Sequence, residues 1–188
     1  RRAIKDYAEE DFKTYDKKIR DDVTFLMDNI MKRYRYTEHG AKAVCIYVID
    51  NDLAAGCPVE ASSTYKGPPS VLTDSAEQRF WQTKKVPFPQ HCTIDLRAER
   101  SVGCVIVDQY GPGFRMTDYE IGISVDGERF TQVVRQEKRT PTALVAAFDP
   151  RNARYVRITS HGTENPTYPT TFFRVQVLQQ PPAKAAQK

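Results

Sequence analysis

The sequence predicts a mainly β fold, an antiparallel sandwich or barrel that follows one long amphipathic helix. Apolar residues recur at helical spacing over the first 36 residues, and this stretch contains neither Gly nor Pro. From Pro58 onward the apolar period changes to two, with Gly, Pro and Asp-Gly between the runs. No helical pattern separates these runs, which favours an antiparallel sheet.

Residues 1–38 are expected to form the helix, which ends at His39-Gly40 because Gly commonly terminates helices. Its apolar stripe follows an eleven-residue repeat, which is typical of a nearly straight helix. The stripe includes Ile4, Phe12, Tyr15, Ile19, Val23, Leu26 and Ile30. A single amphipathic helix needs a surface to cover its apolar side, so the stripe packs either on its own domain or on a neighbouring chain.

A connector is expected over residues 39–57. Within it, Ala43–Ile49 is apolar throughout, and periodicity does not distinguish a buried strand from a short buried helix. The sandwich is expected over residues 58–179 and a flexible tail over residues 180–188. Eight strands are predicted: Val59–Ser63, Cys92–Leu96, Val102–Gln109, Tyr119–Val125, Phe130–Gln136, Ala143–Phe148, Arg154–Thr159 and Phe172–Leu178.

Composition excludes several classes of protein. The chain carries 28 Lys and Arg against 24 Asp and Glu, interspersed along its length, which argues against a nucleic-acid binder. No apolar run approaches the length of a transmembrane helix. The four cysteines show no CxxC spacing, so we expect buried, reduced thiols rather than a zinc or redox site.

Catalytic signatures are missing from the sequence, and neither an enzyme activity nor a cofactor is expected. Asp95 and Asp118 are single acids with no evident partner, so a carboxylate pair is not predicted. His91 and Cys92 are adjacent on a predicted strand, where neighbouring side chains point to opposite faces and cannot act together.

Six short motifs occur in an order that resembles the discoidin family, the coagulation factor type C domains. They are Ala61-Ser62-Ser63, Phe80-Trp81-Gln82, Thr93–Leu96, Val102–Val107, Tyr119–Phe130 and Ala153–Ile158. The resemblance covers about residues 58–179 and implies a jelly-roll sandwich of the galactose-binding-like type. Trp81, the only tryptophan, is expected in the core, and Asp126-Gly127 in a tight hairpin.

The resemblance also implies that ligands bind to loops at one end of the sandwich. Those loops are residues 65–69, 111–116 and 161–168. Their candidate ligand residues are Tyr65, Phe114, Arg115, His161 and Asn165. An aromatic face with polar donors beside it suits a sugar, and the basic members suit an anionic lipid headgroup.

Two departures from the family pattern set the leading hypothesis. No cysteine follows Cys104 to pair with Cys57, and Asp74, a weak candidate for a metal ligand, precedes Ser75 where many family members have Gly. The apolar stripe is also longer than one sandwich can easily cover. We therefore expect a non-catalytic structural subunit of a larger intracellular assembly, which docks on other protein subunits through its N-terminal helix and the surface of the sandwich. The Arg1-Arg2 start favours a mitochondrial setting, with a cilium or cytoskeletal assembly as the alternative. The alternative function is a carbohydrate- or phospholipid-binding module that uses the three loops.

Overall fold

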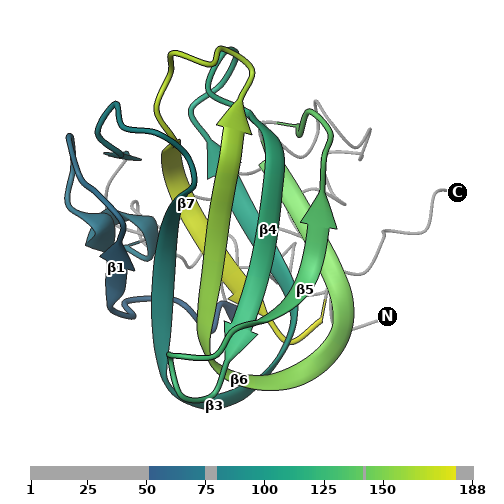
Figure 1. Ribbon diagram of the computed structural model, residues 1–188. Helices are drawn as coiled ribbons and strands as arrows, with labels where there is room; N and C mark the ends of the chain where they lie inside the picture. Colours follow the sequence, from purple (N-terminus) through teal and green to yellow (C-terminus); the bar gives the residue numbers. More distant parts are fainter. Residues whose placement is uncertain (1–50, 75–79, 142, 181–188) are drawn as a thin grey trace, which may run out of the picture. The chain divides into compact units, whose positions relative to one another are not determined.

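The computed structural model describes residues 51–74, 80–141 and 143–180, and these residues form an antiparallel β-sandwich. Its elements are β1 (Val59–Ala61), the short 3-10 helix η2 (Pro69–Leu72), β2 (Trp81–Gln82), β3 (Gln90–Gln109), β4 (Met116–Ser124), β5 (Thr131–Gln136), β6 (Ala143–Thr163) and β7 (Thr171–Leu178) (Figure 1). The predicted mainly β class is confirmed. The predicted helix with its apolar stripe, the segment 43–49 and the tail from residue 181 lie outside the described residues.

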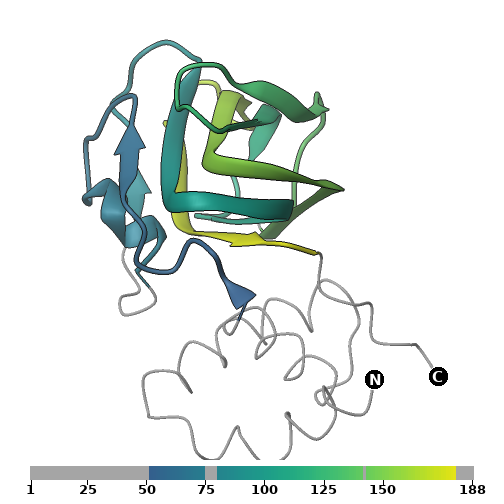
Figure 2. The same ribbon diagram turned by 90° about the horizontal axis from the view of Figure 1, so that it is seen from below.

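Two long strands, β3 and β6, connect the two layers of the sandwich. In one layer, the first half of β3 pairs with β1 on one side and with the second half of β6 on the other. The second half of β6 also pairs with β4, and β4 pairs with β5 at the edge. The second half of β3 pairs with the first half of β6 and with β7, whose other neighbour is β2. Figure 2 shows β3 and β6 turning from one layer into the other. β3 and β6 therefore contribute hydrogen-bonding partners to both layers.

The bend in β3 is fixed by a local change in the backbone and by an ion pair. Arg97 has a positive φ of 66°, and the pairing of β3 with β6 shifts register between Asp95 and Arg100. The guanidinium of Arg154 on β6 donates to both carboxylate oxygens of Asp95, at 2.8 and 2.9 Å. Asp95 also accepts a hydrogen bond from the backbone N–H of Arg97. The acid without an evident partner in the sequence thus holds the corner of the sandwich.

The core lies between the layers and follows from the alternation of apolar residues. Trp81 is fully buried, as predicted; its ring centroid lies 5.8 Å from that of Phe172, and its indole N–H donates to Thr64 Oγ1. Three cysteines, Cys57, Cys92 and Cys104, are buried free thiols, as expected. Among the described residues, no helix is long and apolar enough to cross a membrane.

The strand boundaries differ from the prediction in an informative way. The predicted strands Cys92–Leu96 and Val102–Gln109 are the two halves of β3, and Ala143–Phe148 and Arg154–Thr159 belong to β6. Polar residues at the two bends look like turns in the sequence, although β3 and β6 each continue through the bend as one strand. β2 was not predicted because two residues are too few to show a period.

The Asp126-Gly127 hairpin between β4 and β5 is longer than the expected two-residue turn. Residues 125–130 form the connection, and Gly127 alone among them has a positive φ, of 82°. The Asp126 carboxylate accepts hydrogen bonds from the backbone N–H groups of Glu128 and Arg129 and from the hydroxyl of Ser124. Asp126 therefore organises this connection through its side chain rather than through a left-handed backbone.

Candidate functional site: the loop end

Four connections meet at one end of the sandwich, shown at the top of Figure 1. Strand pairing places them there, since Gln109 is paired with Phe172, Asp108 with Ala143, and Met116 with Thr163. We call this the loop end, and it consists of residues 83–89, 110–115, 137–141 and 164–170. The bends of β3 and β6 lie at the opposite end.

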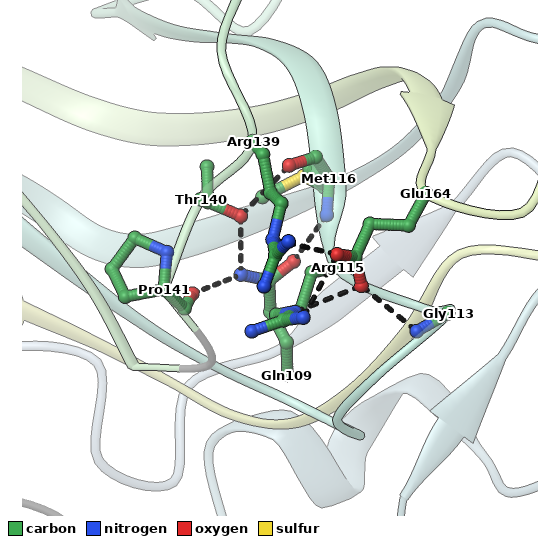
Figure 3. Close-up of polar contacts among 8 residues, drawn as sticks. All are labelled: Gln109, Gly113, Arg115, Met116, Arg139, Thr140, Pro141 and Glu164. Carbon is green, nitrogen blue, oxygen red and sulfur yellow. Dashed lines mark hydrogen bonds and ion pairs between the residues drawn. The ribbon is translucent and has the colours of Figure 1, made fainter.

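A buried glutamine joins two of these connections to the sheet (Figure 3). Gln109, which is 1% exposed, donates through Nε2 to Thr140 Oγ1 and to the carbonyl of Pro141, both at 2.8 Å. Its Oε1 accepts the backbone N–H of Met116 at 2.7 Å. Thr140 in turn donates its hydroxyl to the Met116 carbonyl. Because each polar atom of this amide has a partner, the network fixes the positions at which the neighbouring connections begin and end.

Glu164 ties three connections together. Arg115 donates to it from Nε and Nη2, each at 2.8 Å, in a two-pronged ion pair. The backbone N–H of Gly113 donates to the same carboxylate, and Arg139 Nε lies 2.7 Å from its Oε1 (Figure 3). The Arg115 guanidinium first, and then the Gly113 N–H and Arg139, hold the pKa of Glu164 below its usual value. Glu164 therefore stays charged and holds two guanidinium groups at the loop end.

Five aromatic rings form a continuous row beside this ion pair. Tyr110 stacks on Phe173 with centroids 5.3 Å apart and meets both Phe80 and Phe114 edge-on at 5.0 Å. Phe114 continues to Tyr168 at 4.5 Å. Tyr110 is 45% exposed although it contacts three aromatic rings. We call these five residues the aromatic row.

A pocket of about 250 Å³ lies between two of the connections. It is lined by Lys85, Val86, Pro87, Phe88, Pro166, Thr167, Tyr168 and Pro169. Tyr168 is thus both the end of the aromatic row and a wall of the pocket. An apolar wall with a few polar groups is the usual composition of a small-ligand site.

The position of Tyr168 depends on a glycine. Gly113 has a φ of 83°, and a Cβ at this residue would lie 2.8 Å from Cε2 of the Tyr168 ring. Only glycine combines that backbone conformation with such a close approach of the ring. Asn165 contributes through the backbone, since its N–H donates to the Gly113 carbonyl at 3.0 Å.

Basic residues outnumber acidic ones at the loop end. Its described residues include Lys84, Lys85, Arg115, Lys138 and Arg139 against Glu137 and Glu164. Arg139 is 62% exposed along its side chain, so its charge also acts on the solvent above Glu164. The local potential is therefore positive, which favours ligands with a carboxylate or sulfate group.

The five candidate ligand residues from the sequence separate into two groups. Phe114, Arg115 and Asn165 lie together at the loop end. Tyr65 is 74% exposed and lies where the chain beside it pairs with Gln82. His161 is not in a loop, because β6 extends to Thr163, and its Nε2 lies 3.6 Å from Glu120 Oε2 on the sheet.

Sequence reasoning missed the residues that organise the loop end. Glu164, Arg139 and Tyr110 come from three connections that are far apart in the sequence, so no local spacing relates them. Tyr168 ends the predicted loop, and its aromatic ring next to two prolines was the available signal. No group of three or more His, Cys, Asp or Glu residues with the geometry of a metal site occurs within residues 51–74, 80–141 and 143–180, where Asp74 lies.

Cys92, Asp95 and Asp118, which the sequence analysis considered for catalysis, are either buried or paired with an arginine. Burial raises the pKa of the Cys92 thiol to about 12, so it stays protonated at neutral pH. Cys92 is in the core whereas His91 is on the outer side, as the strand geometry predicts. Asp118 pairs with Arg135 at 2.9 Å, just as Asp95 pairs with Arg154. The chemistry that this architecture offers is recognition by aromatic faces, guanidinium groups and backbone amides.

Comparison with known proteins agrees with this description. The family model of the F5/8 type C domain matches residues 58–172. Chitosan-binding module 2 from the chitosanase/glucanase of Paenibacillus sp. IK-5, solved with chitotriose, is similar with a TM-score of 0.63 and 20% identity over 68% of this chain and 99% of that one. The module CpGH89CBM32-5 of Clostridium perfringens, solved with GalNAc-β-1,3-galactose, has a TM-score of 0.59 and 18% identity over 65% of this chain and 95% of that one. The CBM32 of AlyQ, solved with 4,5-unsaturated mannuronic acid, has a TM-score of 0.56 and 24% identity over 64% of this chain and 93% of that one.

These matches correct the leading functional hypothesis from the sequence. A structural subunit of a larger intracellular, mitochondrial assembly was expected, whereas the similar structures are carbohydrate-binding modules. The missing disulfide partner of Cys57 and the Asp74-Ser75 pair in place of Asp-Gly were given too much weight as signs of such an assembly. The comparisons favour the alternative function, and the structural-subunit hypothesis is wrong.

Proposed function

Because the chain belongs to the F5/8 type C domain family, we propose that its sandwich is a non-catalytic carbohydrate-binding module whose ligand site is the loop end. The observation that carries the proposal is the meeting of the aromatic row, the pocket and the Arg115–Glu164–Arg139 cluster at that end. Tyr168 belongs to both the row and the pocket, so one ligand can contact both. The jelly-roll topology of the family is part of the same proposal.

The aromatic side chains supply the apolar part of recognition. One face of a pyranose ring is lined by C–H groups, which pack against aromatic rings at little cost in desolvation. Tyr168 lines the pocket, and the partly exposed Tyr110 lies beyond Phe114 in the same row, so a sugar chain longer than one ring has a second aromatic surface to follow. Ring positions set by edge and stacking contacts need little ordering on binding, which favours affinity.

The charged groups supply the polar part and favour an acidic sugar. Lys85 lines the pocket, and Arg139 stands partly exposed over Glu164. Arg115 is fixed by two hydrogen bonds to Glu164 and so presents the rest of its guanidinium in a defined orientation. A uronic acid would place its carboxylate near these cations, whereas a neutral sugar would use them only as hydrogen-bond donors.

The experiment is calorimetric titration of the full chain with chitotriose and with a mannuronate oligosaccharide of the same length. We expect saturable binding, tighter for the mannuronate, with the difference reduced at high salt because surface charges are screened. Lys85→Ala should weaken mannuronate binding about threefold to tenfold, as expected for loss of one charge-assisted contact. Lys84→Ala removes the same charge from the neighbouring residue, which does not line the pocket, and should change binding by less than about twofold.

Different titration results would contradict different parts of the proposal. Equal effects of Lys84→Ala and Lys85→Ala would show that general charge, not the pocket, attracts the ligand. Tighter binding of chitotriose would contradict the preference for acidic sugars and retain the module. The site of the protein in the cell, the domain boundaries and the N-terminal helix stay predictions from the sequence.

A further inference from the structure

A second hollow, of about 230 Å³, lies on the outer face of the sheet formed by β3, β6, β4 and β5. Its lining shares no residue with the pocket at the loop end. Two neighbouring rows of strand partners form it. His91, Thr159 and Glu120 lie side by side across three strands, and in the next row Arg157 and Gln132 flank Gly122.

Gly122 creates the space between these side chains. Phe130 packs over this glycine, and a Cβ at residue 122 would lie 3.3 Å from the Phe130 Cβ. The guanidinium of Arg157 lies over the Phe130 ring, 3.8 Å from its centroid, and its Nε donates to Thr93 Oγ1 at 2.9 Å. One wall of the hollow is therefore an aromatic ring and a guanidinium that hold each other in place.

Groups of opposite character face each other across the hollow. Arg157 brings a positive charge and Glu120 a negative one, and His161 Nε2 lies 3.6 Å from the Glu120 carboxylate. Burial, and then the charge of Arg157, lower the pKa of His91, so its imidazole is neutral at neutral pH and both donates and accepts. Thr159, 6% exposed, and the amide of Gln132 add groups of the same dual kind. Neither an anion nor a cation would find a uniform field here.

We propose that this hollow is a second ligand site, which binds one neutral sugar ring independently of the loop end. Hydroxyl groups donate and accept at once, and so match a lining that mixes both kinds of partner. A volume of about 230 Å³ is below the roughly 300–1,000 Å³ of sites for drug-sized ligands, which limits the occupant to a single ring. The choice of a sugar as the ligand class rests on the proposed function, whereas the existence of the site rests on the hollow alone.

The test is an NMR titration of the full chain at neutral pH with galactose and, separately, with N-acetylglucosamine. The reporters are the side-chain amide of Gln132 and the imidazole of His91 for the sheet face, and the backbone amides of Gly113 and Tyr168 for the loop end. We expect saturable shifts of the sheet-face reporters with one of these sugars, at millimolar Kd, because a shallow site contacts few atoms. These shifts should persist in Tyr168→Ala.

Two variants locate the binding. Arg157→Lys removes the planar donors and their packing on Phe130, and should weaken the sheet-face response about tenfold, which corresponds to one charge-assisted hydrogen bond. Glu120→Gln changes the opposite wall of the hollow, and it still tests the site if the Arg157→Lys variant does not fold. Neither variant should alter the shifts at the loop end.

Separate outcomes decide the two proposals. The second site would be overturned if neither sugar gives saturable shifts at the sheet face, or if both variants leave those shifts unchanged. This conclusion does not depend on the response of the loop end. Shifts at the sheet face, together with no binding of chitotriose or the mannuronate oligosaccharide at the loop end, would support the second site and contradict the proposed function.

Discussion

Gln109 shows how a single buried polar residue can organise the connections at the loop end. Its amide makes three hydrogen bonds, to Thr140, Pro141 and Met116, and is almost fully shielded from water. Truncation would leave the buried N–H of Met116 and the hydroxyl of Thr140 each short of a partner. The sequence offers no sign of this role, because a glutamine at the end of a strand is ordinarily a surface residue.

Gln109→Ala should therefore destabilise the protein by about 2–4 kcal/mol, the cost of a small cavity plus unsatisfied buried groups. Urea unfolding followed by circular dichroism measures the change. Gln132→Ala, the same substitution on an exposed residue of β5, should stay within about 0.5 kcal/mol of the wild type. A similar, small loss in both variants would mean that the Gln109 network contributes little.

The Asp126 carboxylate should make the stability of the protein depend on pH. The backbone N–H groups of Arg129 and Glu128 and the hydroxyl of Ser124 lower the pKa of its carboxyl to about 2. Because the folded pKa lies below the unfolded value, the carboxylate stabilises the fold above the unfolded pKa of about 4, and this contribution is lost as the pH falls toward 2. Asp126→Asn should thus melt below the wild type at neutral pH, with the gap closing as acid is added.

A constant gap in melting temperature between the two proteins down to the lowest pH at which they fold would contradict this role of the Asp126 charge. Glu128→Gln in the same connection is the control for loss of a negative charge. It should leave the pH profile close to that of the wild type, because the Glu128 carboxylate is exposed.

At the scale of the elements, the loops depend on glycines for two different reasons. Gly113 has a positive φ and lies against the Tyr168 ring, whereas Gly111, with a φ of 129°, has nothing within 4 Å of an added Cβ. Alanine strains the backbone at both residues, by roughly 1–2 kcal/mol for a left-handed conformation. Only at Gly113 would it also displace an aromatic ring of the pocket.

Gly113→Ala should therefore weaken glycan binding at least about fivefold, while Gly111→Ala should lose stability with little change in affinity. Titration of both variants with the glycan bound by the wild type, at a temperature where both are folded, separates the two effects. Equal losses of affinity would indicate that loop strain, rather than the position of Tyr168, controls the site.

The sequence predicted elements well where one face of the chain is buried and the period is regular. The bounds of β7, β4 and β5 lie within a few residues of the predicted strands, and burial of Trp81 follows from its place among the motifs. The bends of β3 and β6 were read as breaks between strands because the mostly polar residues 97–101 and 149–153 separate the predicted strands. About half of the candidate site could not be predicted from the sequence either, because Glu164 contacts Arg139 only when β5, β6 and β7 are folded together.

At the scale of the whole molecule, the bent strands couple the two layers. β3 and β6 each take part in both layers, so loss of one layer would remove partners from the other. Native-state hydrogen exchange should give similar opening free energies for amides in the two halves of β3, such as Ile94 and Val105, since both are fully buried. A difference larger than about 2 kcal/mol between the halves would show that the layers unfold separately.

We propose that the two ends of the sandwich have different roles, with ligand binding at the loop end and structural support at the bends. The bends are held by Asp95 and Arg154, while the loop end carries the pocket, the aromatic row and an excess of basic side chains. A ligand at the loop end should also raise the stability of the whole sandwich, by about 2.7 kcal/mol at one hundred times its Kd.

The most direct measurement is a glycan-array screen of the full chain, followed by titration of the strongest ligand against wild type and Tyr168→Ala. We expect saturable binding to at least one glycan, and a loss of about tenfold or more in affinity when the aromatic wall of the pocket is removed. Binding to no glycan on the array, or binding that Tyr168→Ala leaves intact, would contradict a ligand site at the loop end.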